Sequence, residues 1–168
     1  GMRMGIGTRE GFLSEVAAIS ASMPPGQPAV IYGYHNLVHG DLTRADLDAI
    51  SAERPIVIWH YSSHDFYLNS AAIKRAGFTP ALAEKFHGVD LDAKGELTGR
   101  IYEDAAFAVV QAYADVILAP ENASAGFHGF SRMLRHAGVT TTVEMGYGLF
   151  GYELEDANIR NNWVDPSR

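Results

Sequence analysis

The run from Thr43 to Ser70, TRADLDAISAERPIVIWHYSSHDFYLNS, constrains the fold of this chain more than any other segment. Thr43 followed by Asp46 forms a capping box, which predicts a helix that continues to about Ile50. Pro55 then opens the apolar strand IVIWH, and polar residues crowd just after it. Polar residues just past the carboxyl end of a buried strand are typical of the places where α/β proteins bind ligands.

The rest of the chain alternates predicted helices with predicted strands, without repeats or an obvious linker. We therefore predict the α/β class, with a mainly parallel sheet, a small antiparallel hairpin insert at about 88–102 and a single unit over residues 1–168. The remaining predicted helices span about 8–22, 70–77, 103–118, 120–138 and 154–161, and the remaining predicted strands span 29–32 and 139–145.

Composition excludes several classes of partner. The formal charge of -7 argues against a broad nucleic-acid interface, which needs clustered Lys and Arg. The chain has no cysteine, so any metal ion would be held by His and carboxylates. The longest apolar stretches fall far below the ~20 residues of a membrane helix. We expect a soluble, cytoplasmic protein, and we expect Gly1 to be left from a cleaved tag, because it precedes Met2.

The turn after the IVIWH strand holds the residues best suited to bind a substrate, namely His64, Asp65 and Asn69. A histidine and an amide at the carboxyl end of a buried strand can bind a polar substrate or orient a metal-bound water. Asn69 is also suited to cap the helix that follows. Glu103 follows another predicted strand, where its carboxylate can act as a general base or metal ligand, or can simply favour the helix dipole.

Other histidines and one further carboxylate leave two interpretations open. His60 and His64 stand four apart, as do His35 and His39, a spacing that on a helix places two rings on one face as metal ligands. Neither pair lies on a predicted helix, so polar loop histidines are the competing interpretation. Glu144 ends the predicted strand VTTTVEM, where it faces either a pocket or solvent.

Several segments together resemble amidohydrolase family 3. The run TRADLDAISAERPIVIWHYSSHDFYLNSAAIKRAGF is similar to the family segment that leads through a "GH" to an "NS" pair. LDAKGELTGRIYEDA is similar to its "D-GEPTG-L-E-A" segment, and LRHAGVTTTVEMG to its "GIT-V-D-G" strand. MPPGQPAVIYGYHNL resembles the segment that precedes them, so the resemblance covers about residues 8–150.

The resemblance implies a metal-dependent hydrolase on a distorted TIM barrel with a small β-rich accessory domain. Members include an N-substituted formamide deformylase, so the implied reaction is hydrolysis of a C–N bond by hydroxide on a zinc-like divalent metal. His64 corresponds to the "GH" histidine, Asn69 and Ser70 to the "NS" pair, and Glu103 to the glutamate after "TG-L". Two positions depart from the pattern: Ser63 replaces a glycine, and Glu144 replaces an aspartate.

A larger departure is the absence of the H-x-H motif that gives such enzymes their first two metal ligands. The chain has 168 residues, whereas a whole barrel has ~250. We therefore predict an amidohydrolase fragment without a complete metal centre, which binds a small-molecule substrate and self-associates through surfaces that truncation exposes. We assign catalysis to His64 and Glu103, substrate binding to His60, Asp65 and Asn69, and no residue to a metal.

Two alternatives stay open. The chain can be a small-molecule-binding or assembly domain that kept the fold and lost the chemistry. It can also be an independent metalloenzyme, provided that four histidine rings meet within a few Å: His35, His39, His60 and His64.

Overall fold

The structure is a computed structural model that describes residues 6–143, 146–148 and 151–162 of the chain. The chain forms two compact units, residues 1–114 and 115–168, where the sequence led us to expect one. No helix in the described ranges is long and apolar enough to cross a bilayer.

The first unit is built on a five-stranded sheet with the order β1-β2-β3-β5-β4. Only β1 and β2 run parallel, and the other three pairs of neighbours are antiparallel. The predicted antiparallel hairpin forms between β4 and β5. The strands are β1 (Ala29–Tyr34), β2 (Ile56–His60), β3 (Asp65–Leu68), β4 (Val89–Leu91) and β5 (Leu97–Tyr102).

The prediction of a mainly parallel sheet is wrong because it treats the whole segment after His60 as a polar turn. Residues 61–64 do form the turn, but Asp65–Leu68 folds back as β3 and pairs antiparallel with β2. Phe66 and Leu68 are buried and alternate with two partly exposed residues, so the segment carries the period of two of a strand. β5 then pairs with β3, which makes the rest of the sheet antiparallel.

Capping residues set the helix boundaries of the first unit much as the sequence predicts. Thr8 caps α1 through its side-chain oxygen, the Thr43–Asp46 capping box begins α3, and Asn69 caps α4. Gly77 ends α4 with the left-handed backbone that favours glycine. The helices and 3-10 turns are α1 (Arg9–Ser22), α2 (Asn36–His39), α3 (Arg44–Ile50), α4 (Ser70–Ala76), η1 (Pro80–Glu84), η2 (Glu103–Ala105) and α5 (Ala106–Ala112).

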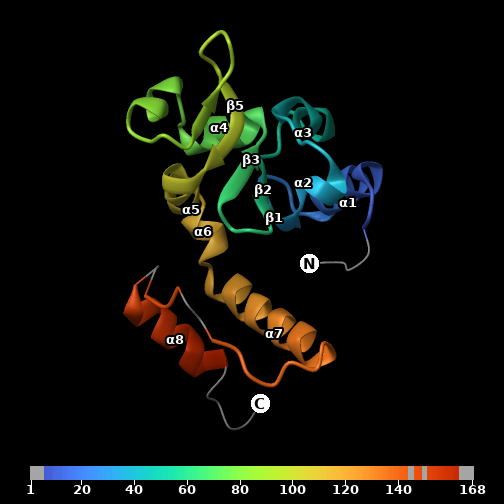
Figure 1. The fold of residues 1–168 in the computed structure, drawn as a ribbon, viewed down its shortest axis with the longest axis vertical. Helices are drawn as coiled ribbons and strands as arrows, with labels where there is room; N and C mark the ends of the chain where they lie inside the picture. The colour runs from blue at the N-terminus through green and yellow to red at the C-terminus, as the bar shows by residue number, and fades with distance from the viewer. Residues whose placement is uncertain (1–5, 144–145, 149–150, 163–168) are drawn as a thin grey trace. The chain divides into compact units, whose positions relative to one another are not determined.

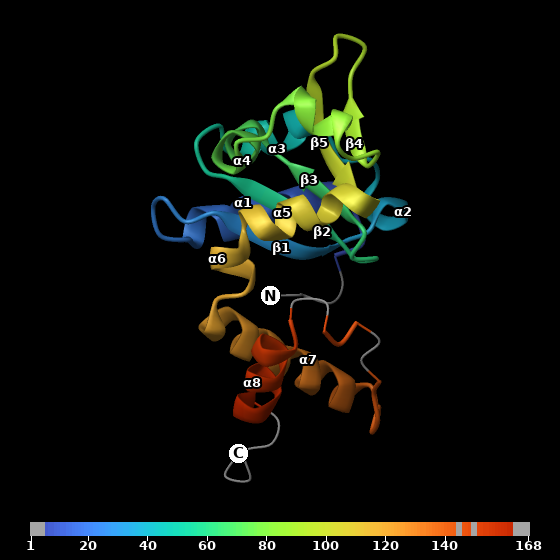
Figure 2. The ribbon, with the colours of Figure 1, turned by 90° about the vertical axis from the view of Figure 1, so that its left-hand side faces the viewer.

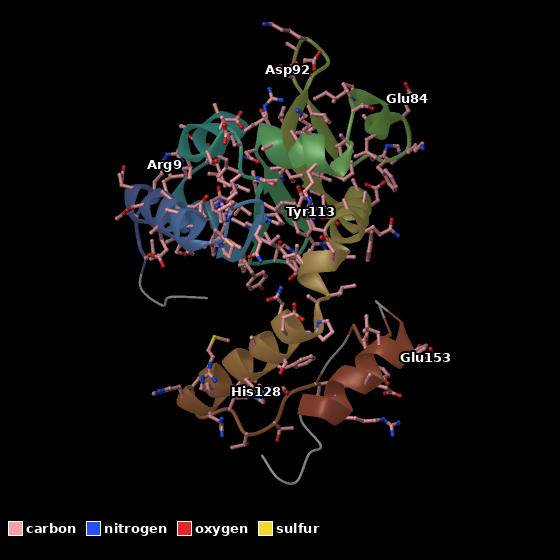
Figure 3. The ribbon with its side chains drawn as sticks, turned by 180° about the vertical axis from the view of Figure 1, so that it is seen from behind. Arg9, Glu84, Asp92, Tyr113, His128 and Glu153 are labelled. Atoms are coloured by element: carbon pink, nitrogen blue, oxygen red, sulfur yellow. The ribbon has the colours of Figure 1, made fainter. Side chains whose placement is uncertain are left out.

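The predicted helix over 103–118 is broken into three pieces: η2, α5 and α6 (Ala114–Ile117). Glu103 has a φ of 48°, outside the right-handed helical region, so the α-helix does not begin there; η2 covers Glu103–Ala105, and α5 begins at Ala106. Tyr113 ends α5 with a non-helical backbone and lies fully buried, where its hydroxyl donates to the Ala72 carbonyl at 2.9 Å. Figure 3 labels Tyr113 in the first unit.

Helices cover both faces of the sheet (Figures 1 and 2). On one face, Phe12 and Val16 of α1 and Leu47 of α3 belong to a core cluster that includes Ile56 and Ile58 of β2. Since successive strand residues point to opposite faces, Val57, Phe66 and Ile101 lie on the other face, where α5 packs. The sheet is therefore held rigidly at its centre, and its strand ends are positioned by two packed layers.

The second unit contains α7 (Pro120–His136) and α8 (Tyr152–Asn162), which match the two helices predicted there. The predicted strand over 139–145 is not formed in its described part, residues 139–143, and Glu144 lies outside the described residues. A strand needs a partner for its backbone groups, and the described part of this unit contains no other strand.

Candidate functional site

Three strands of the first unit end at one edge of the sheet, which we call the carboxyl edge. Tyr34 at the end of β1 pairs with His60 at the end of β2, and Tyr102 at the end of β5 pairs with Asp65. The carboxyl edge therefore gathers polar residues from segments far apart in the chain. They are His35, Asn36, His60, Ser62, His64, Asp65 and Glu103.

The structure brings together His64 and Glu103, the two residues predicted to be catalytic. His64 Nδ1 lies 3.2 Å from Glu103 Oε2, although the residues are separated by 39 positions in the chain. The Glu103 amide also donates to the His64 carbonyl at 2.9 Å, which ties the two backbones together. Both side chains are about two-thirds exposed, at 63% and 64%, so the pair is open to a ligand.

Unusual backbone conformations flank this pair. Ser63 has a φ of 68° and Glu103 a φ of 48°, and no other non-glycine residue in the described ranges has a positive φ. The left-handed region is sterically costly for residues with a Cβ, and such residues cluster at functional sites. The resemblance expects a glycine at position 63, which is the residue that this conformation favours.

His60 lies beside the pair, buried at 7% exposure, and both of its ring nitrogens are engaged. Nδ1 is 2.8 Å from Ser62 Oγ and accepts the Ser62 amide at 3.3 Å, while Nε2 is 3.3 Å from Asn36 Oδ1. Because Nδ1 accepts an amide proton and Asn36 Oδ1 is an acceptor, the ring carries its proton on Nε2. Burial lowers the pKa of His60; nearby His35 and Arg100 lower it further, and Asp65 opposes them.

The other two histidines of this region hold the fold. The His35 ring stacks on Tyr61 at 4.1 Å between centroids and 7° between planes. His39 is buried, its Nδ1 accepts the His35 amide at 3.0 Å and its Nε2 donates to the Ile6 carbonyl at 3.0 Å. No group of three or more His, Asp or Glu side chains able to hold a metal occurs among the described residues, so the four-histidine metal site is not formed.

Asp65, predicted to bind substrate, lies within reach of Arg100 of β5, two residues before its register partner Tyr102. Its carboxylate oxygens are 3.4 and 3.5 Å from one guanidinium nitrogen, which is long for a charge-assisted hydrogen bond. The guanidinium also sits 4.5 Å from the centroid of the Tyr102 ring. Asp65 is therefore already paired with a cation, and its assignment to substrate binding stays a prediction.

Asn69 has a structural role in place of the substrate-binding role that the sequence predicts. Its side chain is fully buried, and its Oδ1 accepts the amides of Ile56 and Ala72 at 2.9 and 2.8 Å. Its Nδ2 donates to the carbonyls of Ser51 and Arg54 at 2.8 and 2.9 Å. All four hydrogen-bonding positions of the amide are used within the fold, so none is left for a ligand.

Other residues of the resembling segments also maintain the fold. The Asp48 carboxylate accepts the Ser70 amide at 2.8 Å and the Ser70 hydroxyl at 2.7 Å, which joins α3 to the start of α4. Gly99 has a φ of 94°, and a Cβ there would lie 2.4 Å from the Leu68 carbonyl oxygen. These positions need their residues for packing, whatever the chemistry of the site.

Sequence reasoning missed Ser62 and Asn36, which bracket the His60 ring. The H-x-S spacing of His60 and Ser62 is a signal that could have found the first, because a short turn brings such side chains together. Asn36 lies 24 positions from His60 and carries no signal of its own.

The arrangement of His64 and Glu103 suits proton transfer or metal binding. With Nδ1 directed at a carboxylate, the ring is oriented as a carboxylate–imidazole pair, and Nε2 is the nitrogen that remains to accept a proton or coordinate a metal. The described residues supply at most these two ligands at this point, which falls short of a complete metal centre.

Comparisons with known proteins indicate the family and the fold of the chain. The model of the amidohydrolase family matches residues 3–160. The exoenzymes regulatory protein AepA of Pectobacterium carotovorum subsp. carotovorum is 29% identical over 150 residues, which cover 84% of this chain and 32% of that protein. This chain thus spans about a third of the length of that relative.

Two solved structures, both uncharacterized metal-dependent hydrolases, are also similar. The one from Pyrococcus horikoshii OT3 has a TM-score of 0.51 and 20% identity, with 82% of this chain and 25% of that chain covered. The one from Pyrococcus furiosus has a TM-score of 0.49 and 22% identity, with 75% and 25% covered. The likeness to the first shows a shared fold over a quarter of that protein.

Proposed function

Since the chain belongs to the amidohydrolase family, we propose that it carries the His64–Glu103 part of the active site of a metal-dependent hydrolase acting on C–N bonds of the amide or formamide type. The observation that carries the proposal is the 3.2 Å contact between His64 Nδ1 and Glu103 Oε2, with both side chains open to solvent. The parallel pair β1–β2, joined through α3, is the unit that a TIM barrel repeats, which supports an origin in a distorted barrel.

In this proposal the chain's own residues position and move a proton. Glu103 accepts the Nδ1–H of His64 and holds the ring in the tautomer whose Nε2 can accept a proton from a water or return it to a leaving amine. The strained backbone at Ser63 and Glu103 fixes both groups at the open edge of a rigid sheet.

The described residues do not fit a complete metal site, because no third His, Asp or Glu joins His64 and Glu103. We propose that the other ligands of a zinc-like divalent ion come from a different polypeptide segment. This chain spans only 32% of the length of the Pectobacterium relative, which is consistent with that proposal. The isolated chain then binds a divalent metal weakly and holds none after purification.

A zinc titration followed by NMR tests the proposal. The ring signals of His64 should shift first among the seven histidines, at zinc concentrations in the millimolar range, and His64→Gln or Glu103→Gln should abolish that early shift. Exposed His87 provides the matched control, since His87→Gln should leave the His64 response unchanged. Tightly held stoichiometric zinc in the purified chain, or a His64 ring that does not respond, would overturn the proposal.

Assays of the hydrolysis of N-formyl and N-acyl amines test the proposed substrate class. Any zinc-dependent turnover by the chain should vanish in both the His64→Gln and the Glu103→Gln variants, because a proton-transfer pair fails when either member is lost. Turnover that survives both substitutions would place the chemistry elsewhere.

A second candidate function is a small-molecule-binding or assembly domain without chemistry. The specific observation that favours it is the Pectobacterium relative, which is named as a regulatory protein. The two functions differ in the His64→Gln variant: a binding domain would show altered affinity for amide ligands with no turnover to lose, whereas the hydrolase loses turnover.

We also propose self-association through the outer edge of β1. β1 is the last strand at its side of the sheet and its sequence, AVIYGY, lacks the charges that protect edge strands. Exposed apolar side chains of Tyr32, Leu37 and Val38 lie on and after this strand. Light scattering should show a mass above that of one chain that falls on dilution, and a monomer at every concentration would contradict it.

A further inference from the structure

The carboxyl edge contains a second group of reactive side chains that the hydrolase proposal does not use. Ser62 lies in the turn between β2 and β3, and its Oγ is 2.8 Å from His60 Nδ1. The His60 ring is buried, whereas Ser62 is only partly so. A hydroxyl within hydrogen-bonding distance of a neutral imidazole is the first part of an activated serine nucleophile.

Asn36 supplies the second part. Its Oδ1 lies 3.3 Å from His60 Nε2, on the opposite side of the ring from Ser62. An acceptor at that position fixes the proton on Nε2 and leaves Nδ1 as the base that faces the Ser62 hydroxyl. The nucleophile, the base and the group that orients the base are thus all present, and Asn36 comes from a different element, α2.

From this geometry we propose that Ser62, His60 and Asn36 form a nucleophilic triad that reacts with activated acyl or phosphoryl esters at Ser62 Oγ. The triad is separate from the His64–Glu103 pair and needs no metal ion. Its members are recognised by their roles and distances, as in other serine triads whose residues come in different chain orders.

The reaction balances with the groups at hand. Ser62 Oγ forms a bond to the carbonyl carbon or phosphorus atom, and its proton passes to His60 Nδ1. The bond to the leaving group breaks, and the leaving group departs as an anion or takes the proton back from His60. The product is an ester of Ser62, and no oxidant, reductant or further reactant is consumed.

Two features of the contact between Ser62 and His60 are not explained by stabilisation of the turn alone. A serine that only stabilised the turn would need no more than the bond its Oγ accepts from the His64 amide at 3.2 Å. Such a serine would not require Asn36, 24 positions away in the chain, to bind Nε2 of the His60 ring. It would also not require the His60 ring to be buried, at 7% exposure, beside a partly exposed hydroxyl. Those two features are the ones that a base in a triad requires.

Labelling with diisopropyl fluorophosphate tests the proposal, because the reagent transfers a phosphoryl group to activated serines and releases fluoride. The full chain is incubated with the reagent in the presence of a chelator, which removes any contribution from metal ions. Intact mass measures the rate of labelling, and peptide mapping locates the adduct. We expect one adduct, on Ser62, formed at least tenfold faster in the folded chain than in the same chain in urea.

Variants show whether Ser62 is labelled because His60 activates it or only because it is exposed. Ser62→Ala should remove the adduct, whereas Ser63→Gly, a change at the neighbouring exposed serine, should keep it. His60→Gln should slow labelling by about a hundredfold, the usual contribution of a general base. Asn36→Leu should slow it by less, and Asn36→Asp, which keeps an acceptor for Nε2–H, should restore it.

Three results would overturn the triad. They are an adduct at Ser63 instead of Ser62, labelling of the folded chain no faster than in urea, and labelling of the His60→Gln variant at the wild-type rate. None of them bears on the zinc response of His64, so failure of the triad and failure of the hydrolase proposal are distinguishable.

Discussion

His64 and Asn69 stand five positions apart in one resembling segment, yet they do opposite things in the structure. Asn69 is completely buried, and all four positions of its amide bind backbone groups of the same unit. His64 is 63% exposed, is preceded by a strained residue, and directs one ring nitrogen at a single carboxylate. One sequence motif therefore contains both residues that stabilise the fold and residues available for chemistry. Their contacts in the structure show which residue has which role.

The same contrast occurs between Gly99 and Glu103 in the segment TGRIYED. Gly99 allows β5 to pass close to the end of β3, since a Cβ would meet the Leu68 carbonyl oxygen at 2.4 Å. Glu103, four residues later, has a positive φ although it carries a Cβ, and its carboxylate is exposed beside His64. The buried members of this comparison should control stability, and the exposed members should control ligand binding.

The largest expected effect is that of Asn69→Ala. The change leaves two buried amides and two carbonyls without partners, at a cost of about 3–5 kcal/mol in the free energy of unfolding. Urea denaturation measures it, and Gln27→Ala, a change at an exposed side-chain amide, is the control and should cost less than about 1 kcal/mol. Similar losses from the two changes would show that burial of the amide does not distinguish the two kinds of residue.

Gly99→Ala should have the next largest effect. A side chain at φ 94° is strained, and its Cβ would also press on the Leu68 backbone, so we expect a loss of about 2–4 kcal/mol. Gly95 at the tip of the same hairpin has a φ of 80°, but a Cβ added there would meet no atom within 4 Å, which makes Gly95→Ala the matched control. Thermal unfolding of both variants separates backbone strain from the clash, and equal losses would refute the clash.

His60 should produce a smaller effect that depends on pH. Its pKa in the folded chain is lowered, mainly by burial and with help from His35 and Arg100, while Asp65 opposes the shift. The unfolded chain therefore binds a proton at a higher pH than the folded chain, so stability is complete above about 6.5, the ordinary pKa of histidine, and is lost as pH falls through the lowered value. Urea denaturation between pH 8 and 5 should show this loss, and His60→Gln should make the dependence shallower than in His87→Gln.

Much of the first unit could be predicted from the sequence because its signals are local. The capping residues Thr8, Thr43 and Asn69 and the glycine at 77 lie within four residues of the backbone they control. β3 was missed because the segment DFYL has only 4 residues and directly follows a polar turn, so its strand character emerges only when β2 and β5 pair with it.

The site was predictable only in part for the same reason. His64 and Glu103 could be selected one at a time, but their contact depends on β3 pairing with both β2 and β5, which the predicted parallel sheet did not contain. For Asn69 the sequence left a helix cap and a substrate ligand both open, because the same side-chain amide suits either role. The bond between Asn36 and His60 depends on the pairing of β1 with β2, which places the turns after these strands side by side.

The smallest expected effect on stability is that of His64→Gln and Glu103→Gln. A contact between two exposed polar side chains contributes little, so each change should alter the free energy of unfolding by no more than about 0.5 kcal/mol while it abolishes the early zinc response. This combination is the opposite of the one expected for Asn69→Ala, whose cost falls on folding. A loss above about 1 kcal/mol for Glu103→Gln, measured in urea at pH 7, would instead make the His64–Glu103 contact a support of the fold. The exposed residues His64 and Glu103 would then not differ in role from the buried Asn69, because all three would be needed to hold β2, β3 and β5 together.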